Sequence, residues 1–372
     1  MPVDWAEIHR SRNVSWPTLP LAVCSFLYGL GLRAVRKRRR RRGGNRLPGF
    51  VVSIGNLTVG GSGKTPAVAA LAGWASRQGY RVAVLSRGYG AGAGKGVRAV
   101  SDGKKVLCGL SEAGDEPLML AGQLPGVPIY VCRDRYLAGR AAHTETGADF
   151  FVLDDGFQHW TLARDLDIVL MDDVEPVGNG HLLPWGPLRE PVEALQRAHA
   201  VVLTRARPHG MRPGPGEEVL SRFPGVPRFQ SVHVPSGVVF PGAGTVQPPS
   251  HVKGRRVTAF CGIARPEAFR QSLMELGAEV AEFYPFRDHH PFTRKGVDRI
   301  VRRWREKGSD LLLTTEKDWM RAGPFLKGED KAGFLRVELA FHSGKEAFFD
   351  LVRDGATAAG VRGAADGFRS ME

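Results

Sequence analysis

Short apolar runs alternate with helical patterns along the middle of the chain. The runs are four to six residues long and lie at 50–54, 82–85, 127–132, 149–153, 167–171 and 200–203. Runs of this length and composition are typical of strands that are buried on both faces. Because helical patterns separate them, they predict a parallel sheet covered by helices. A hairpin is predicted over 96–107, with Asp102-Gly103 at its turn.

A change in composition divides the chain into units. Residues 211–255 are rich in Pro and Gly and include one extended stretch at 229–234, so we interpret them as a connection. After it, strand, helix and strand patterns occur at 256–261, 269–276 and 310–313. We therefore predict four segments: a membrane-associated helix with a basic flank, a phosphate-binding core, the connection and a smaller α/β domain, over 1–46, 47–210, 211–255 and 256–372.

The amino-terminal segment is predicted to contact a membrane. No charged residue occurs between Asn13 and Leu32, and nine positive charges and no acid follow over residues 33–46. Basic residues after an apolar stretch favour retention of the segment, with the body of the protein on the cytoplasmic side. Pro17 and Pro20 leave fewer than the roughly 20 helical residues that a span needs. A helix lying at the membrane surface and a spanning helix therefore both remain open.

Composition and charge limit the classes of protein considered. The chain has 372 residues, 42% of them hydrophobic, which suits two cores of ordinary size. Its net charge of +14 is mostly local, because the basic flank carries +9 and leaves about +5 for the rest. A basic run alone would also suit a nucleic-acid arm, but the adjoining apolar stretch disfavours that function. The four cysteines show no metal-binding spacing, and we expect them to be reduced.

A glycine-rich turn after the first strand predicts a nucleoside triphosphate site. Backbone N–H groups of such a turn surround phosphates, its lysine neutralises their charge, its threonine ligates Mg²⁺, and the next helix points its positive end at the anion. Thr58 stands where the usual pattern has glycine. The residues predicted to hold the nucleotide are Gly60, Gly61, Ser62, Gly63, Lys64, Thr65 and Pro66.

A pair of acidic residues ends the apolar run at 149–153. A phosphate loop needs an acid for Mg²⁺, usually at the end of a neighbouring strand. Asp154 and Asp155 have that position, and we expect one of them beside the metal, directly or through water. A turn followed by a helix cap is the structural alternative.

Other polar clusters follow predicted strand ends. Loops that carry Gly, Arg, Asp and His at such places often bear the chemistry of α/β proteins. The clusters lie at 86–90, 114–117, 155–159, 178–184 and 186–191.

Together these motifs closely resemble the tetraacyldisaccharide 4′-kinases, which phosphorylate a lipid A precursor at the cytoplasmic face of the bacterial inner membrane. The resemblance covers most of the chain and includes 55–66, 262–266, 288–291 and 315–318 in addition to the polar clusters. It implies a P-loop NTPase-like fold, the cofactors ATP and Mg²⁺, and an acylated disaccharide lipid as substrate. It implies no nucleic acid, and no protein partner is evident. Trp185 is a departure, because a small residue is expected there.

The resemblance also implies roles for individual residues. Asp115 is the candidate base, partnered by His289, with His290 as the weaker alternative, and Lys64 is catalytic. The expected Mg²⁺ set is Thr65, Asp154, Asp155 and, as an outer member, Glu190. Substrate contacts are expected from Arg87, Tyr89, Gln158, His159, Asn179 and Arg189, and Arg135 and Arg265 are further arginines for anionic groups.

Two other functions remain alternatives. A switch-type ATPase or GTPase of the metallochaperone class would hydrolyse nucleotide without a lipid. Its guanine-reading Asn-Lys-x-Asp motif is absent, since Lys317 and Asp318 are adjacent. A non-enzymatic binder built on the basic run would leave the charged loops of the core unexplained.

Overall fold

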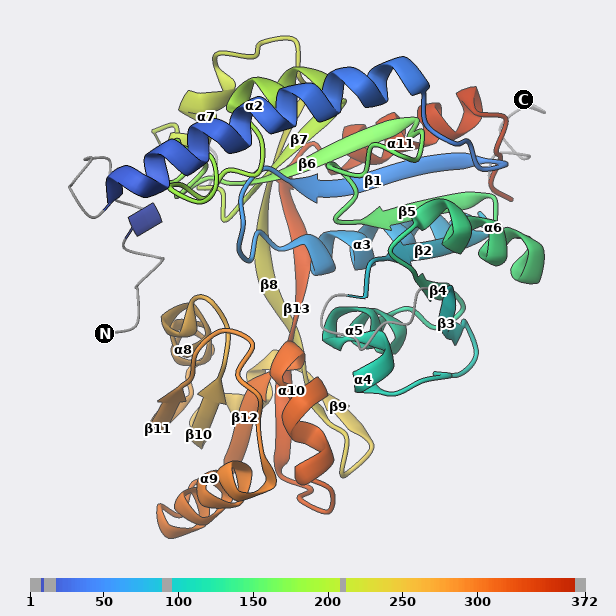
Figure 1. The fold of residues 1–372 in the computed structure, drawn as a ribbon. Helices are drawn as coiled ribbons and strands as arrows, with labels where there is room; N and C mark the ends of the chain where they lie inside the picture. Colours follow the sequence, from blue (N-terminus) through green and yellow to red (C-terminus); the bar gives the residue numbers. More distant parts are fainter. Residues whose placement is uncertain (1–7, 10–17, 89–95, 208–211, 365–372) are drawn as a thin grey trace.

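One mixed sheet of 13 strands passes through the whole molecule in the computed structural model (Figure 1). The structure describes residues 8–9, 18–88, 96–207 and 212–364. The strand order is β11-β10-β12-β13-β8-β7-β6-β1-β5-β2-β4-β3, and β9 pairs with β8. The strands at one end of this order form a core unit, and those at the other end form a second unit.

The core unit holds a parallel sheet with one antiparallel edge strand. Its strands are β1 Phe50–Asn56, β2 Val82–Ser86, β3 Arg98–Asp102, β4 Pro128–Val131, β5 Phe150–Asp154, β6 Leu166–Asp172 and β7 Ala200–Thr204. Strand β1 lies between β5 and β6, and only β3 runs antiparallel to its neighbour β4. The helices of this unit are α3 Lys64–Arg77, α4 Leu110–Ala113, α5 Asp115–Gln123, α6 Arg135–Thr146 and α7 Pro215–Leu220. All six apolar runs of the core are therefore confirmed as strands.

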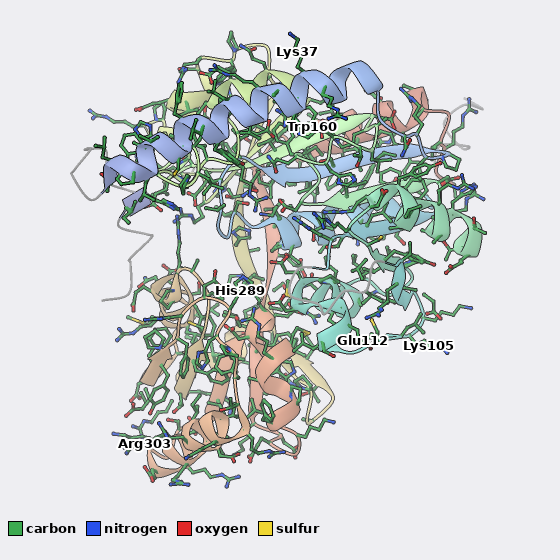
Figure 2. All side chains as sticks on the ribbon, viewed as in Figure 1. Lys37, Lys105, Glu112, Trp160, His289 and Arg303 are labelled. Atoms are coloured by element: carbon green, nitrogen blue, oxygen red, sulfur yellow. The ribbon has the colours of Figure 1, made fainter. Side chains whose placement is uncertain are left out.

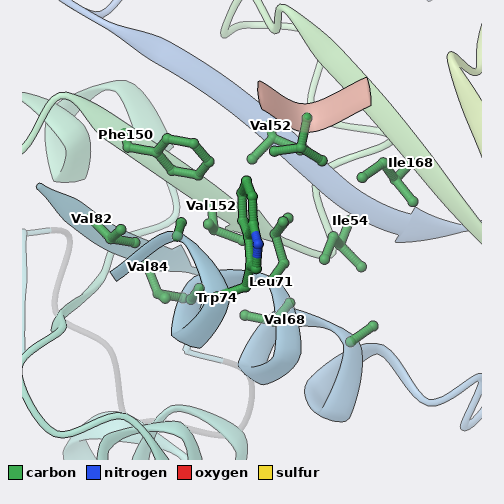
Figure 3. Close-up of a cluster of buried hydrophobic side chains, with 14 of the residues drawn as sticks. Val52, Ile54, Val68, Leu71, Trp74, Val82, Val84, Phe150, Val152 and Ile168 are labelled. Atoms are coloured by element: carbon green, nitrogen blue, oxygen red, sulfur yellow. The ribbon is translucent and has the colours of Figure 1, made fainter. Parts of the chain in front are cut away.

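Helix α3 anchors the phosphate loop because its apolar face is buried against the sheet (Figure 3). Val68 and Leu71 pack with Val52 and Ile54 of β1, and both helix side chains are at most 1% exposed. Burial of a side chain of this size contributes about 1.5 to 3 kcal/mol. The start of α3 is thus fixed relative to the ends of β1 and β5.

The second unit is a smaller α/β layer with strands β10 Arg256–Cys261, β11 Glu279–Pro285 and β12 Leu311–Thr315 (Figure 1). Its helices are α8 Pro266–Glu275, α9 Arg294–Glu306 and α10 Glu316–Ala322. Strand β10 pairs in parallel with both β11 and β12. The predicted elements at 256–261, 269–276 and 310–313 are confirmed, whereas the pattern did not reveal β11.

Two long strands join the units. Strand β8, Arg228–Phe240, pairs antiparallel with β13, Ala332–Ser343, and both cross the gap between the upper and lower parts of Figure 1. The Pro- and Gly-rich connection at 211–255 thus contains a long strand, of which the sequence pattern predicted only the part at 229–234. Pairing with β13 holds the whole of Arg228–Phe240 extended.

The carboxyl-terminal helix returns to the core unit, which differs from the predicted boundary at 256–372. Helix α11, Lys345–Ala358, buries Phe348, Phe349 and Val352 in the same cluster as β1 and α3. The ring of Phe349 stacks on Trp74 of α3 with 4.7 Å between centroids. The core unit therefore combines residues from both ends of the chain.

Helix α2, Leu19–Arg42, lies across the outside of the core (Figure 1). Ser25 Oγ donates to the Leu182 carbonyl at 2.8 Å, and Tyr28 Oη donates to the Arg189 carbonyl at 3.1 Å. Its other side is apolar and exposed, for example at Val23 and Leu27, which are 54% and 59% exposed. By length and composition, 19–38 is apolar enough to cross a membrane.

Candidate functional site

The phosphate loop connects β1 to α3, and its last glycine has a special conformation. Gly63 has φ +79°, in the left-handed region that glycine adopts without strain. A Cβ atom at Gly63 would lie 2.3 Å from Nε2 of His233 on β8. Helix α3 then begins at Lys64, and its first N–H groups have no partner within the helix. The position therefore requires glycine for both conformation and space.

The buried oxygen atoms near this loop that have no hydrogen-bond partner include Ser62 Oγ and Asp154 Oδ1. Buried polar atoms are normally paired, so these two indicate where ligand groups are expected. Thr65 is also buried, 7% exposed, in the first turn of α3. The donors and acceptors present fit a triphosphate and a Mg²⁺ ion held largely by phosphate oxygens. Over the described ranges, no cluster of three His, Cys, Asp or Glu residues could hold a metal by itself.

Lys64 points toward the acidic end of β5. Its Nζ donates to Asn56 Oδ1 at 3.2 Å and lies 3.6 Å from Asp155 Oδ1. The ammonium is therefore held at the loop by neutral and acidic oxygens. Asn56 is a supporting residue that the sequence analysis did not single out.

The two neighbouring aspartates have opposite electrostatic environments. Burial, with the negative charges of Glu116 and Asp155, raises the pKa of Asp154 to about 6. Burial acts in the same direction on Asp155, but the charges of Lys64 and Arg189 outweigh it and hold the pKa of Asp155 below its ordinary value. Arg189 donates to both carboxylate oxygens of Asp155, at 2.9 and 2.7 Å. The pair thus offers one readily ionised acid and one that titrates near neutrality.

Asp115 and His289 come together across the two units. Asp115 begins α5 of the core, and His289 lies in the loop after β11, with 3.7 Å between Asp115 Oδ2 and His289 Nδ1. Figure 2 shows His289 at the edge of the lower unit that faces the core. The structure therefore brings together two residues that are 174 positions apart in sequence.

Helix α10 supplies two cations to this pair. Arg321 donates to Asp115 Oδ2 and lies 3.0 Å from His289 Nδ1. Lys317 Nζ lies 3.2 Å from His289 Nε2. Although burial acts to raise it, the hydrogen bond and charge of Arg321, with Lys317 and His289, hold the pKa of Asp115 below its ordinary value. Neither Arg321 nor Lys317 was assigned a role from the sequence.

Glu116 links the Asp115 cluster to the acids of the phosphate site. Its negative charge contributes to the raised pKa of Asp154, and its Oε1 lies 3.9 Å from Lys317 Nζ. Buried Arg135 lies in the same region, close enough to interact with both aspartates. Burial lowers the pKa of Arg135, and the charges of Asp154 and Asp155 act in the opposite direction. The motif at 114–117 includes Glu116, but in the sequence only Asp115 of that motif was predicted to have a role.

Glu190 does not share the environment of the other predicted Mg²⁺ ligands. Arg197 donates to both of its carboxylate oxygens, at 2.8 and 2.7 Å, and the residue is 1% exposed. Arg36 of α2 lies 4.0 Å from the same carboxylate. Two arginines thus lie at this carboxylate, and the role of Glu190 as an outer metal ligand stays a prediction.

The remaining predicted substrate residues occupy different surroundings. Gln158 Nε2 donates to the Asn56 carbonyl at 3.0 Å, close to the phosphate loop. His159 lies 3.0 Å from Thr161 Oγ1, and Asn179 donates to the Trp185 carbonyl within its own loop. Tyr89 lies outside the described residues.

The other predicted arginines and Trp185 have clear neighbours. Arg265 lies 3.2 Å from Asp172 and 2.5 Å from Glu175, so it joins the second unit to the core. Arg87 contributes to the electrostatic environment of Arg135. Trp185 stacks on His181 at 3.7 Å between centroids, which gives the unexpected aromatic residue a packing role.

Comparison with known sequences identifies extensive similarity. The family model described as "Tetraacyldisaccharide-1-P 4'-kinase" matches residues 17–355. The tetraacyldisaccharide 4'-kinase of Syntrophus aciditrophicus is 41% identical over 348 residues, covering 90% of this chain and 92% of that protein. The enzyme of the same name from Geobacter metallireducens is 43% identical and covers 83% and 86% of the two chains.

A solved structure shares the fold. LpxK from Aquifex aeolicus, described as an "apo" form in complex with ATP, is 32% identical with a TM-score of 0.73. The match covers 91% of this chain and 98% of that one. The similarity therefore includes both units and the strands that join them.

Proposed function

The chain belongs to the tetraacyldisaccharide 4′-kinase family, and from that premise we propose which residues carry its reaction. The protein uses ATP to phosphorylate the 4′-position of a tetraacyldisaccharide 1-phosphate, a step of lipid A synthesis. The assignment of the site rests on the position of the Asp115–His289–Arg321 cluster next to the phosphate site. The two are neighbours because the negative charge of Glu116, the residue after Asp115, contributes to the raised pKa of Asp154.

The phosphate loop is proposed to bind the triphosphate of ATP. Ser62 and the N–H groups at the start of α3 would donate to phosphate oxygens, and Lys64 would neutralise their charge. Thr65, Asp154 and Asp155 are the residues proposed to hold Mg²⁺, with Glu116 as an additional acid nearby. When bound there, Mg²⁺ would supply positive charge against the negative charge of the phosphates.

Asp115 is proposed to accept the proton of the 4′-hydroxyl. Its depressed pKa keeps it ionised at neutral pH, and a carboxylate has about four lone-pair sites, so contacts with Arg321 and the Glu116 N–H leave room for the hydroxyl. His289 and Arg321 would orient the carboxylate. Because phosphoryl transfer has a loose transition state, the base contributes less than positioning and charge neutralisation.

Arginine side chains are proposed to handle the remaining negative charge. Arg189 is fixed to Asp155 by two hydrogen bonds, and Arg135 is buried beside both aspartates. Either guanidinium could stabilise the transferring phosphoryl group from a fixed position. Gln158 lies at the same edge of the sheet through its bond to Asn56.

Helix α2 is proposed to hold the enzyme at the cytoplasmic face of the inner membrane. One side of the helix is docked on the loop at 178–191 through Ser25 and Tyr28. The opposite side exposes large apolar residues that suit acyl chains, and its basic end suits anionic headgroups. This arrangement favours a helix lying at the surface.

The test is transfer of label from γ-labelled ATP to the acceptor lipid in neutral detergent with Mg²⁺. We expect labelled lipid with wild type and almost none with Lys64→Ala. ATP hydrolysis without lipid labelling, by protein shown to be folded, would instead support the switch-type ATPase. Omission of Mg²⁺, with and without Mn²⁺ in its place, tests the metal requirement separately.

A further inference from the structure

A basic cavity of about 900 Å³ lies beneath the carboxyl-terminal half of α2. Figure 2 shows Lys37 on the helix and Trp160 directly below it. The charged and aromatic residues that line the cavity are Arg33, Arg36, Lys37, Trp160, Arg164 and Arg197. Of this set, Arg36 and Arg197 contact Glu190.

Two of these arginines already have acidic partners and form fixed walls. Arg164 donates to both oxygens of Asp167, at 2.7 and 3.1 Å. Arg197 is held by Glu190 through two hydrogen bonds and lies 4.4 Å from the centroid of the Trp160 ring. The acidic partners largely neutralise these two charges. Arg164 and Arg197 therefore define the shape of the cavity and add little net charge to it.

The cations from α2 are not neutralised in this way. Arg33 and Lys37 are exposed, and over the described ranges no carboxylate forms an ion pair with either of them. Arg36 lies 5.5 Å from the centroid of Trp160 and only 4.0 Å from Glu190, which is already paired. The cavity therefore has an excess of positive charge, which suits an anion.

A second cavity of about 340 Å³ adjoins the first through Arg33, which lines both. Its wall includes Phe26 and Leu30 of α2 with Leu182 and Trp185 of the loop beneath. A basic cavity and an apolar cavity thus follow one another along the same helix. That order matches an amphiphile with an anionic group next to an acyl chain.

We propose that the basic cavity binds the 1-phosphate of the acceptor lipid, through Arg33, Arg36 and Lys37. This inference rests on the proposed function, and it places the acceptor phosphate apart from the phosphates of ATP. The loop after β5 has Asp155 at one end and Trp160 at the other, and five residues span at most about 18 Å. The wall of the basic cavity at Trp160 therefore lies within about 18 Å of Asp155 in the phosphate site.

The experiment compares two acceptors in neutral detergent micelles: the 1-phosphate lipid and the same lipid with that phosphate removed. In Arg33→Gln/Lys37→Gln we expect the KM for the 1-phosphate lipid to rise about tenfold or more, because two charge-assisted contacts are lost. The KM for the dephosphorylated lipid and kcat for both should change less than twofold. Both side chains are exposed, so the substitutions should not affect folding.

Arg38→Gln/Arg46→Gln is the matched control, since it removes two charges from the same segment outside the cavity. We expect it to keep the wild-type preference for the phosphorylated acceptor. An equal loss with both acceptors, or an unchanged preference in Arg33→Gln/Lys37→Gln, would overturn the proposal.

Vesicle flotation separates the acceptor phosphate from membrane headgroups. If Arg33→Gln/Lys37→Gln loses binding to phosphatidylglycerol vesicles but keeps its preference between acceptors, the cavity recognises membrane lipid and the proposal is wrong. Failure of the proposed function would look different, because wild type would then label neither acceptor. In that case tighter binding of the 1-phosphate lipid than of its dephosphorylated form, lost in the double variant, would still support the anion site.

Discussion

The phosphate-loop site and the Asp115 site are assembled in different ways. The first takes its residues from β1, the start of α3 and the end of β5, all within the core and linked by direct strand pairing. The second joins the start of α5 to α10 of the other unit, and Arg321 is 206 residues from Asp115. One site needs only the core, whereas the other needs both units in the correct relative position.

This difference separates two steps of the reaction. In the proposed mechanism, nucleotide binding depends on groups that the core alone holds in place. The proposed proton acceptor, Asp115, makes ion pairs between units, and these lower its pKa. Variants of the two sites should therefore divide into those that lose ATP affinity and those that keep it.

The largest effect is expected for Lys64→Ala. Loss of the cation that lies 3.6 Å from Asp155 should lower kcat/KM about 10³-fold or more and weaken ATP binding as well. Label transfer and titration with a fluorescent ATP analogue measure the two quantities. Lys105→Ala, an exposed lysine in the hairpin at 96–107, is the control and should match wild type. Retained ATP affinity in Lys64→Ala would remove Lys64 from the nucleotide site.

Asp115→Asn is expected to follow, with kcat reduced about 10² to 10⁴-fold, the range of general-base catalysis. ATP affinity should stay within about twofold of wild type, because the phosphate loop does not depend on this carboxylate. Glu112→Gln changes a more exposed acid just before α5 and serves as the control. Unchanged turnover in Asp115→Asn would exclude Asp115 as the base. Weakened ATP binding in the same variant would show that the two sites are not independent.

Asp154→Asn should stabilise the nucleotide-free protein by about 2 to 3 kcal/mol at pH 8. The pKa of Asp154 is raised to about 6 from an ordinary value of 3.8, so its ionised form is unfavourable in the folded state. The stability that the protonated carboxyl contributes is full below pH 3.8 and is lost as the pH rises through 6. The advantage of Asn should therefore fade between pH 6 and pH 4, as measured by urea unfolding.

Asp155→Asn is the matched comparison, and the opposite sign is expected. The pKa of Asp155 is held below its ordinary value, so its ionised form stabilises the fold at neutral pH and its removal should destabilise. An advantage for Asp154→Asn that is independent of pH would point to packing in place of ionisation.

The smallest effect is expected for Arg321→Ala, which tests the contact between units. Without this guanidinium the pKa of Asp115 should rise, since Arg321 is the main group that lowers it. The acidic limb of the kcat/KM profile should move to higher pH, while turnover at alkaline pH stays above that of Asp115→Asn. Arg321→Lys should restore part of the wild-type profile. An acidic limb that does not move would show that Asp115 is not the titrating group.

The phosphate-loop site could be predicted from the sequence because its information is local. Lys64 and Thr65 follow a strand directly, and Asp154 ends another apolar run, so periodicity and spacing placed these residues at one edge of the sheet. Asp115 and His289 came from resemblance alone, since nothing local shows that they approach one another. Arg321 was missed because its partner lies in the other unit.

The errors at the level of elements have a related cause. Strand β13 and the full length of β8 are only partly buried, and their pairing with one another makes them strands. Long-range partners determined each of these outcomes.

Helix α11 has a consequence for the order in which the protein is made. The ribosome releases β1 and α3 early, yet Phe348, Phe349 and Val361 complete the cluster around Trp74. The second unit emerges in between and has its own apolar clusters, so it can fold first. The nucleotide-binding core is thus begun first and finished last. A chain that stops after β13 would leave this core open, with apolar surface available to chaperones and proteases.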